Sequence, residues 1–124
     1  MSQIIATTLS NGSVSVPTAT VVNGSAKSWV NFNGTGTVAI RDSFNVASLT
    51  DNGTGDYTAN FTTALADANY AGLTTIEADS IADSRFIAPV KFNARTTSSI
   101  GVFGAFSAAN TKLDAAYICV AIFR

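Results

Sequence analysis

The 124-residue chain contains no histidine, one cysteine, one tryptophan and two prolines. Without histidine, a Ser–His or Cys–His nucleophile pair and a His-ligated zinc or iron site are impossible. A single cysteine forms neither an internal disulfide nor a thiolate cluster. These absences predict a chain without enzymatic activity, without a bound metal and without a cofactor.

Charged side chains are also scarce. Lys and Arg number 7, Asp and Glu number 8, and together they make up 12% of the chain, against roughly 25% in a typical soluble domain. A net charge of −1 removes the electrostatic basis for a nucleic-acid partner. Ser, Thr and Asn, at 13, 16 and 10 residues, take the place of the charges. An apolar content of 47% with eight Phe suffices for a core, so we do not expect disorder.

The chain also lacks a long hydrophobic run. The longest, Ala115 to Phe123, has nine residues, whereas a membrane-spanning helix needs about 20. The segment from Met1 to Ala6 has no basic region followed by an apolar stretch, so it does not resemble a secretory signal. We therefore expect synthesis in a cytoplasm and no insertion into a membrane.

Alternating apolar and polar residues dominate what remains. Tyr57, Ala59 and Phe61 alternate with polar neighbours, which is typical of a half-buried strand. Asn-Gly pairs begin at positions 11, 23, 33 and 52 and favour tight turns between antiparallel strands. The pattern predicts an all-β fold, an antiparallel β-sandwich of jelly-roll-like type. Strands are expected near residues 4–9, 27–33, 36–41, 43–50, 56–63, 69–78, 86–93, 97–104 and 115–123.

The two ends of the chain differ in composition. Apart from Leu9, residues 7–25 hold only small, polar and β-branched types, and every aromatic residue lies between Trp29 and Phe123. Large apolar groups are needed to build a core, so residues 1–26 are interpreted as an N-terminal arm or docking segment and 27–124 as the sandwich domain. The alternative is a single edge strand preceded by a loose lead.

The closing run from Ala115 to Phe123 is apolar on both sides of its pleat and therefore requires burial on both faces. A central strand of a sandwich satisfies this requirement, and so does a strand at a subunit interface. A similar excess of apolar residues occurs from Gly101 to Phe106. We interpret both segments as signs of a homo-oligomer, with these interface candidates: Phe103, Phe106, Tyr117, Ile118 and Ile122.

Two acidic segments are candidates for chemistry. The segment Asp51 to Asp56 offers oxygen ligands for calcium, but it lacks the spacing of a calcium loop, and a Gly-rich hairpin turn is the favoured interpretation. The segment Glu77 to Asp83 holds three acids and raises the possibility of glycoside hydrolysis by paired carboxylates. A solvated strand edge is the favoured interpretation. Cys119 lies within the most apolar run and is interpreted as an inert small hydrophobe.

One block is more specific than any of these patterns. Residues 28–71 contain the string WVNFNGTG, then IRDSFNV, then DNGTGDYT. This block resembles a β-structured module of tailed-phage virion proteins, found at the end of tail fibres and as a short free-standing surface protein of aquatic phages. The resemblance covers 44 of the 124 residues. It implies a non-enzymatic virion component, a homotrimer, displayed on the virion surface after synthesis in the host bacterial cytoplasm.

Three functions follow as hypotheses. The first is host attachment as a tail-fibre or adhesin module, with other virion proteins bound through the arm and a host surface glycan or protein bound through polar loops. The receptor-contact candidates are Asn52, Gly53, Thr54, Arg95, Thr96, Thr97 and Ser98. The second is capsid decoration, in which the chain cements the head and its arm extends a neighbouring sheet. The third is an enzyme acting on surface polysaccharide.

Overall fold

The computed structural model describes residues 1–77, 90–107 and 109–124. Over these ranges the chain forms one helix, α1 (Thr18–Gly24), between its second and third strands. The strands are β1 (Thr8–Ser10), β2 (Ser15–Pro17), β3 (Ala26–Asn33), β4 (Ala39–Phe44), β5 (Val46–Asp51), β6 (Asp56–Phe61), β7 (Ala71–Ile76), β8 (Val90–Arg95), β9 (Ser99–Phe103), β10 (Ala105–Phe106), β11 (Lys112–Leu113) and β12 (Ile118–Phe123).

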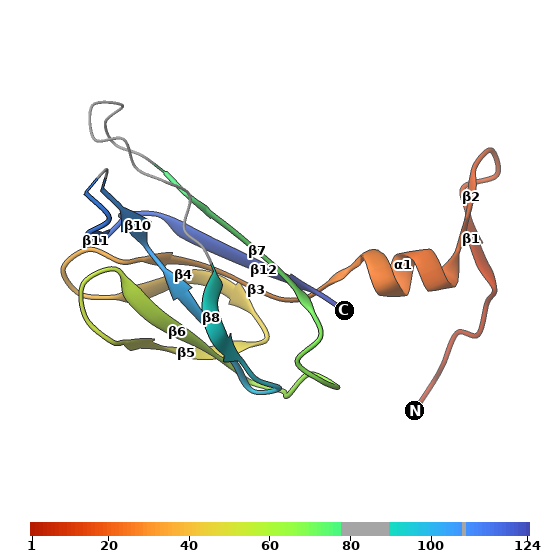
Figure 1. Cartoon of the computed structure of the whole chain (residues 1–124). Helices are drawn as coiled ribbons and strands as arrows, with labels where there is room; N and C mark the ends of the chain where they lie inside the picture. The colour runs from red at the N-terminus through yellow and green to blue at the C-terminus, as the bar shows by residue number, and fades with distance from the viewer. Residues whose placement is uncertain (78–89, 108) are drawn as a thin grey trace.

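Two four-stranded antiparallel sheets, β4-β3-β12-β7 and β5-β6-β9-β8, pack against each other. The arrangement is visible in Figure 1 and confirms the predicted all-β sandwich. The first and last strands of the sandwich, β3 and β12, pair as in a jelly roll. In contrast, β3–β4, β5–β6 and β8–β9 pair as consecutive neighbours. The short strands β10 and β11 form a separate hairpin.

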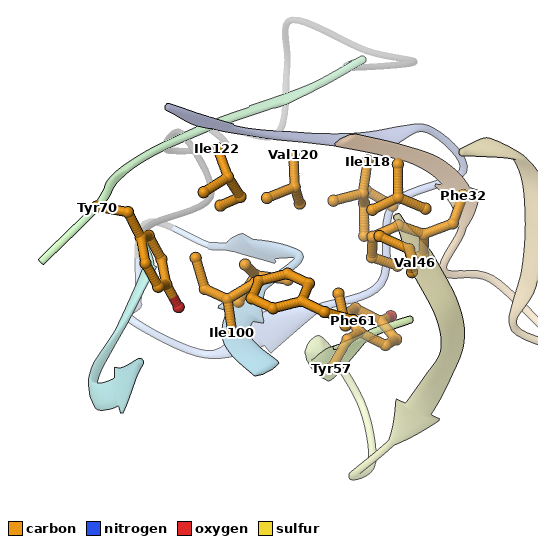
Figure 2. Close-up of a cluster of buried hydrophobic side chains, with 13 residues drawn as sticks. Phe32, Val46, Tyr57, Phe61, Tyr70, Ile100, Ile118, Val120 and Ile122 are labelled. Carbon is orange, nitrogen blue, oxygen red and sulfur yellow. The ribbon is translucent and has the colours of Figure 1, made fainter. Parts of the chain in front are cut away.

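The core lies between the two sheets and follows the predicted alternation of residues. In β6, Tyr57, Ala59 and Phe61 are buried, as their spacing predicts. Figure 2 shows Ile118, Val120 and Ile122 of β12 directed at aromatic and aliphatic side chains of the opposite sheet. The core residues are Val30, Phe32, Val46, Tyr57, Ala59, Phe61, Tyr70, Ile100, Val102, Ala115, Ile118, Val120 and Ile122.

The Asn-Gly pairs take two kinds of position. Asn11-Gly12 and Asn52-Gly53 lie in the hairpin turns β1–β2 and β5–β6, where Gly12 and Gly53 have φ values of 94° and 113°. Asn33-Gly34 begins the connection from β3 to β4. These three positions confirm the expected turns between antiparallel strands. The fourth pair, Asn23-Gly24, instead ends α1, which sequence periodicity did not predict.

Residues 1–25 form an arm that projects from the sandwich (Figure 1). Its parts are the β1–β2 hairpin and α1, which follows Pro17. Proline is compatible with a helix start because its φ is already helical and its missing N–H is not needed there. None of residues 1–25, all of which the structure describes, is buried. The arm therefore contributes nothing to the core of its own chain.

Candidate functional site

The two predicted receptor-contact loops lie at opposite ends of one sheet. Asn52, Gly53 and Thr54 form the β5–β6 turn, directly before β6. The segment 95–98 spans the end of β8 and the turn into β9. Because β6 pairs with β9 from Asp56↔Phe103 to Asn60↔Ser99, the two turns are separated by the length of β6. A strand of six residues spans about 20 Å. One protomer therefore does not join both loops into a single binding surface.

The β5–β6 turn belongs to the end of the sandwich that lies away from the arm (Figure 1). It is joined there by the β3–β4 connection and by the segment that links β9 to β12. The Gly34 N–H donates to the Ala115 carbonyl at 2.9 Å, and the Gly104 N–H donates to the Gly55 carbonyl at 3.0 Å. We call three segments the distal loops: 34–38, 52–55 and, of the link from β9 to β12, the described residues 104–107 and 109–117.

A buried tyrosine ties the distal loops together. The hydroxyl of Tyr57 lies 2.7 Å from the Gly34 carbonyl oxygen and 2.6 Å from Asp114 Oδ1, so its single proton faces two acceptors. The same Asp114 oxygen accepts the Gly55 N–H at 2.7 Å. Burial, together with the Asp114 carboxylate, raises the pKa of Tyr57 far above its usual range. The phenol therefore stays protonated and acts as a fixed donor.

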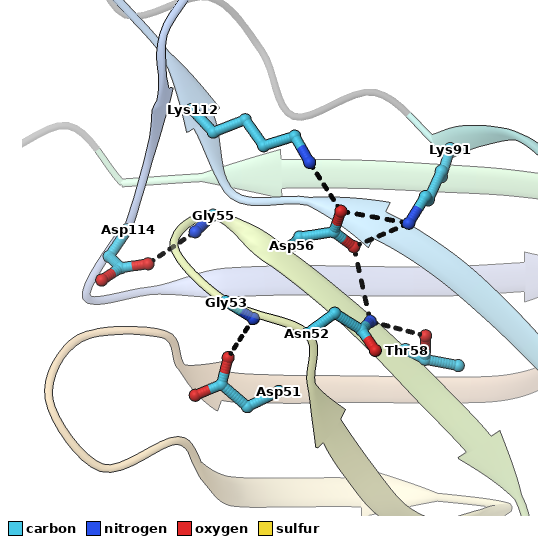
Figure 3. A network of polar contacts seen from close by, with 9 residues as sticks. All are labelled: Asp51, Asn52, Gly53, Gly55, Asp56, Thr58, Lys91, Lys112 and Asp114. Carbon is cyan, nitrogen blue, oxygen red and sulfur yellow. Dashed lines mark hydrogen bonds and ion pairs between the residues drawn. The ribbon is translucent and has the colours of Figure 1, made fainter.

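A second network surrounds Asp56 (Figure 3). Lys91 Nζ donates to the two carboxylate oxygens at 2.9 and 3.0 Å, and Lys112 Nζ donates to one of them at 2.6 Å. The Asp56 side chain is 9% exposed. Its burial raises the pKa, but the hydrogen bonds and charges of Lys112 and Lys91 together outweigh this effect, and the pKa lies below its ordinary value. Asp56 therefore joins β6 to β8 and β11 as a carboxylate.

The acids of the proposed calcium loop have other partners. Asp51 Oδ1 accepts the Gly53 N–H at 2.9 Å, and Asn52 Nδ2 donates to Thr58 Oγ1 at 3.0 Å. Asp56 is bound to its two lysines. Within 1–77, 90–107 and 109–124, the structure gathers no group of three His, Cys, Asp or Glu side chains that could hold a metal ion. The Asp51–Gly53 contact is that of a hairpin turn, and Asp56 is held by long-range ion pairs.

The acidic segment from Glu77 to Asp83 is largely outside the described residues, which stop at Glu77 and resume at Val90. The Glu77 N–H donates to the Tyr117 carbonyl at 3.1 Å. The paired-carboxylate hypothesis therefore stays a prediction.

The interface candidates fall into two groups. Ile118 and Ile122 are 0% and 1% exposed and belong to the core, so their assignment to a subunit surface is wrong. The pleat of β12 directs both side chains toward the opposite sheet. The rings of Phe103 and Phe106 are partly buried against each other, with centroids 5.3 Å apart. Tyr117 is 39% exposed, and the Arg41 guanidinium lies 3.8 Å from its ring centroid.

Sequence reasoning missed an apolar row on the outer face of the β4-β3-β12-β7 sheet. Trp29 pairs with Phe44 on one side and with Ala121 on the other, and Ala121 pairs with Leu73. Paired residues of antiparallel strands share a face, so these four side chains form one row across all four strands. We call them the apolar stripe. No sequence spacing links these four residues, because they come from four different strands that only the register aligns.

Comparison with known protein families, with curated proteins and with solved structures finds no match to this chain. Among the described residues, no helix combines the length and the apolar character needed to cross a membrane.

The Asp56 network leads to a prediction about acid stability. Replacing Asp56 with Asn is expected to lower the free energy of unfolding by about 1–2 kcal/mol at pH 7, because two lysines lose their charged acceptor. The pKa of Asp56 is lower in the folded chain. Its contribution is therefore complete above the unfolded value of about 3.9 and is lost as the pH falls through the folded value.

Urea unfolding of the two proteins at pH 7 and in a series down to pH 2.5 checks this expectation. The difference between them should shrink in the acid part of the series. A constant difference across the series would show that the lost stability does not come from ionised Asp56. Asp51→Asn, at the exposed last residue of β5, serves as the control.

Proposed function

We propose that this chain is a non-enzymatic structural protein of a tailed-phage particle, displayed on its exterior as a host-attachment module. One observation carries the proposal: the arm and the distal loops lie at opposite ends of the sandwich. The exposed arm, residues 1–25, leaves one end, and the distal loops occupy the other (Figure 1). A module anchored by its arm would present these loops outward. The resemblance of residues 28–71 to a phage virion module supports the same assignment.

Two properties of the distal loops suit recognition of a host surface glycan or protein. The contacts of Tyr57 and Asp56 hold the loop backbones in place, so binding would not require them to become ordered. Asn52 and Thr54 are exposed and offer amide, hydroxyl and backbone groups. In this arrangement the segment 95–98 lies at the arm's end, so the proposal retains only Asn52, Gly53 and Thr54 as receptor contacts.

The test uses a phage that encodes this chain and its host cells. Purified chain is expected to bind the cells and to compete with phage adsorption at micromolar concentration. Thr54→Arg, in the distal loops, should weaken competition at least tenfold, whereas Thr97→Arg, at an equally exposed turn at the opposite end, should leave it unchanged. Both residues are exposed, so neither substitution should disturb the fold.

Immunogold labelling of intact particles supplies the second part of the test. Label at the tail tip is expected. Label spread over the head, together with normal adsorption of particles that lack the chain and a loss of their heat or salt resistance, would overturn attachment in favour of capsid decoration. Loss of viscosity when the chain is mixed with host polysaccharide would overturn the non-enzymatic assignment.

A further inference from the structure

The apolar stripe is exposed although it crosses a complete sheet. Phe44, Trp29 and Leu73 are 54%, 36% and 55% exposed. A hollow of about 340 Å³ lies against this face, and Trp29, Leu73, Cys119 and Ala121 contribute to its wall. A contiguous apolar surface that crosses a sheet from one edge strand to the other is typical of an interaction surface.

The outer face of the other sheet provides an internal comparison. There the cross-strand contacts are hydrogen bonds between polar side chains. Asn60 Nδ2 donates to Ser48 Oγ at 3.1 Å and to Thr50 Oγ1 at 3.0 Å. One sandwich thus carries one outer face with polar cross-strand contacts, suited to solvent, and another that is crossed by an exposed apolar stripe.

An unsatisfied polar atom lies on the same apolar face. Among the described residues, the Oδ1 atom of Asn31 is the buried side-chain oxygen or nitrogen that has no hydrogen-bond partner. Asn31 pairs with Asp42 and Cys119, one row away from the apolar stripe. Buried polar atoms in folded proteins nearly always have partners.

The arm is a second uncovered apolar surface, and it leads directly into β3. Residues 1–26 contain no charged side chain. Ile4, Ile5, Leu9 and Val22 line a hollow of about 550 Å³ and are exposed. A hairpin of three-residue strands and a seven-residue helix are not stable without packing. Both the arm and the apolar stripe therefore need a partner, and β3 connects them.

We propose that a second copy of this chain covers the apolar stripe and the arm together, in a parallel assembly around a rotation axis. Around such an axis, identical side chains approach one another, so charged groups there would repel. A foreign partner would place no such restriction on the surface, because opposite charges could meet across it. The absence of any charged side chain from residues 1–26 therefore favours a copy of the same chain.

The assembly would also place all arms at one end and all distal loops at the other. This inference concerns contacts between copies only, so its test and the adsorption test above can succeed or fail independently. It also relocates the subunit contact that the sequence suggested. The proposed contact does not involve Ile118 and Ile122, which face the core, but residues on the outer face of the same sheet.

Light scattering after size-exclusion chromatography of the full chain tests the proposal. The unmodified chain is expected to elute as an assembly of two or more copies at 50 μM. Leu73→Asp, on the apolar stripe, and Ile5→Asp, on the arm, are each expected to weaken association at least tenfold. Thr50→Asp, on the polar outer face of the other sheet, is the matched control and should leave association unchanged, since an Asp there can still accept the Asn60 amide.

Trp29 reports on the same surface because it is the single tryptophan of the chain. Dissociation by Leu73→Asp should shift its emission to longer wavelength and raise acrylamide quenching at least twofold. Circular dichroism identifies any variant that fails to fold, and in that case Leu73→Ser takes its place. A monomeric unmodified chain, or equal effects of Thr50→Asp and Leu73→Asp in folded proteins, would overturn the proposal. Dissociation without a change at Trp29 would overturn it too.

Discussion

Gly55→Ala is expected to lower the free energy of unfolding by about 3–4 kcal/mol, whereas Gly36→Ala should lower it by only about 1–2 kcal/mol. The two glycines have the same φ of 61°, in the left-handed region. Both substitutions therefore carry the cost of a left-handed conformation for an L-residue. The surroundings differ, because a Cβ at Gly36 meets nothing within 4 Å, and a Cβ at Gly55 meets the backbone oxygen of Leu113 at 2.6 Å.

The extra cost at Gly55 arises because backbone atoms must move. The displaced segment includes Asp114, which accepts the Gly55 N–H and the Tyr57 hydroxyl. We therefore expect Gly55→Ala to weaken receptor competition as well as stability. Urea unfolding followed by Trp29 fluorescence measures the stabilities at one protein concentration. Equal losses for the two variants would show that the distal loops are loose enough to accept a side chain.

Local patterns predicted those features of the fold that depend on local chemistry. The alternation in β6 correctly predicted which of its side chains are buried, and Asn52-Gly53 correctly predicted a hairpin turn. The helix α1 was missed because it is short, contains Val21 and Val22, and buries no residue. β-branched residues favour strands over helices, and a helix without a buried face leaves no periodic signal.

The candidate site was less predictable, because it depends on long-range pairing. Lys91 and Lys112 reach Asp56 across 35 and 56 residues of sequence, and no spacing rule links them. The same is true of the apolar stripe, whose members come from four strands. The turns at 52–54 and 95–98 have similar polar compositions, and only the β6–β9 register shows that they lie at opposite ends.

The closing strand shows how one apolar run can serve two purposes. Ile118→Ala is expected to lower the free energy of unfolding by about 3–4 kcal/mol, because the side chain is fully buried and its removal leaves a cavity. Cys119→Ala, at the next position, should lower it by less than about 1 kcal/mol, since this side chain is partly exposed on the outer face. Thermal and urea unfolding at a fixed concentration measure both changes.

Ile118→Ala should leave the association between copies intact, although it lowers the stability of each sandwich. If Ile118 were part of the contact between copies, its replacement would weaken association and would leave the stability of the monomer unchanged. We expect the reverse, a less stable sandwich that still associates through Trp29 and Leu73. Because side chains alternate along a strand, the apolar run that suggested an interface contains two sets of residues. One set forms the core, and the other lies on the face that a second copy is proposed to cover.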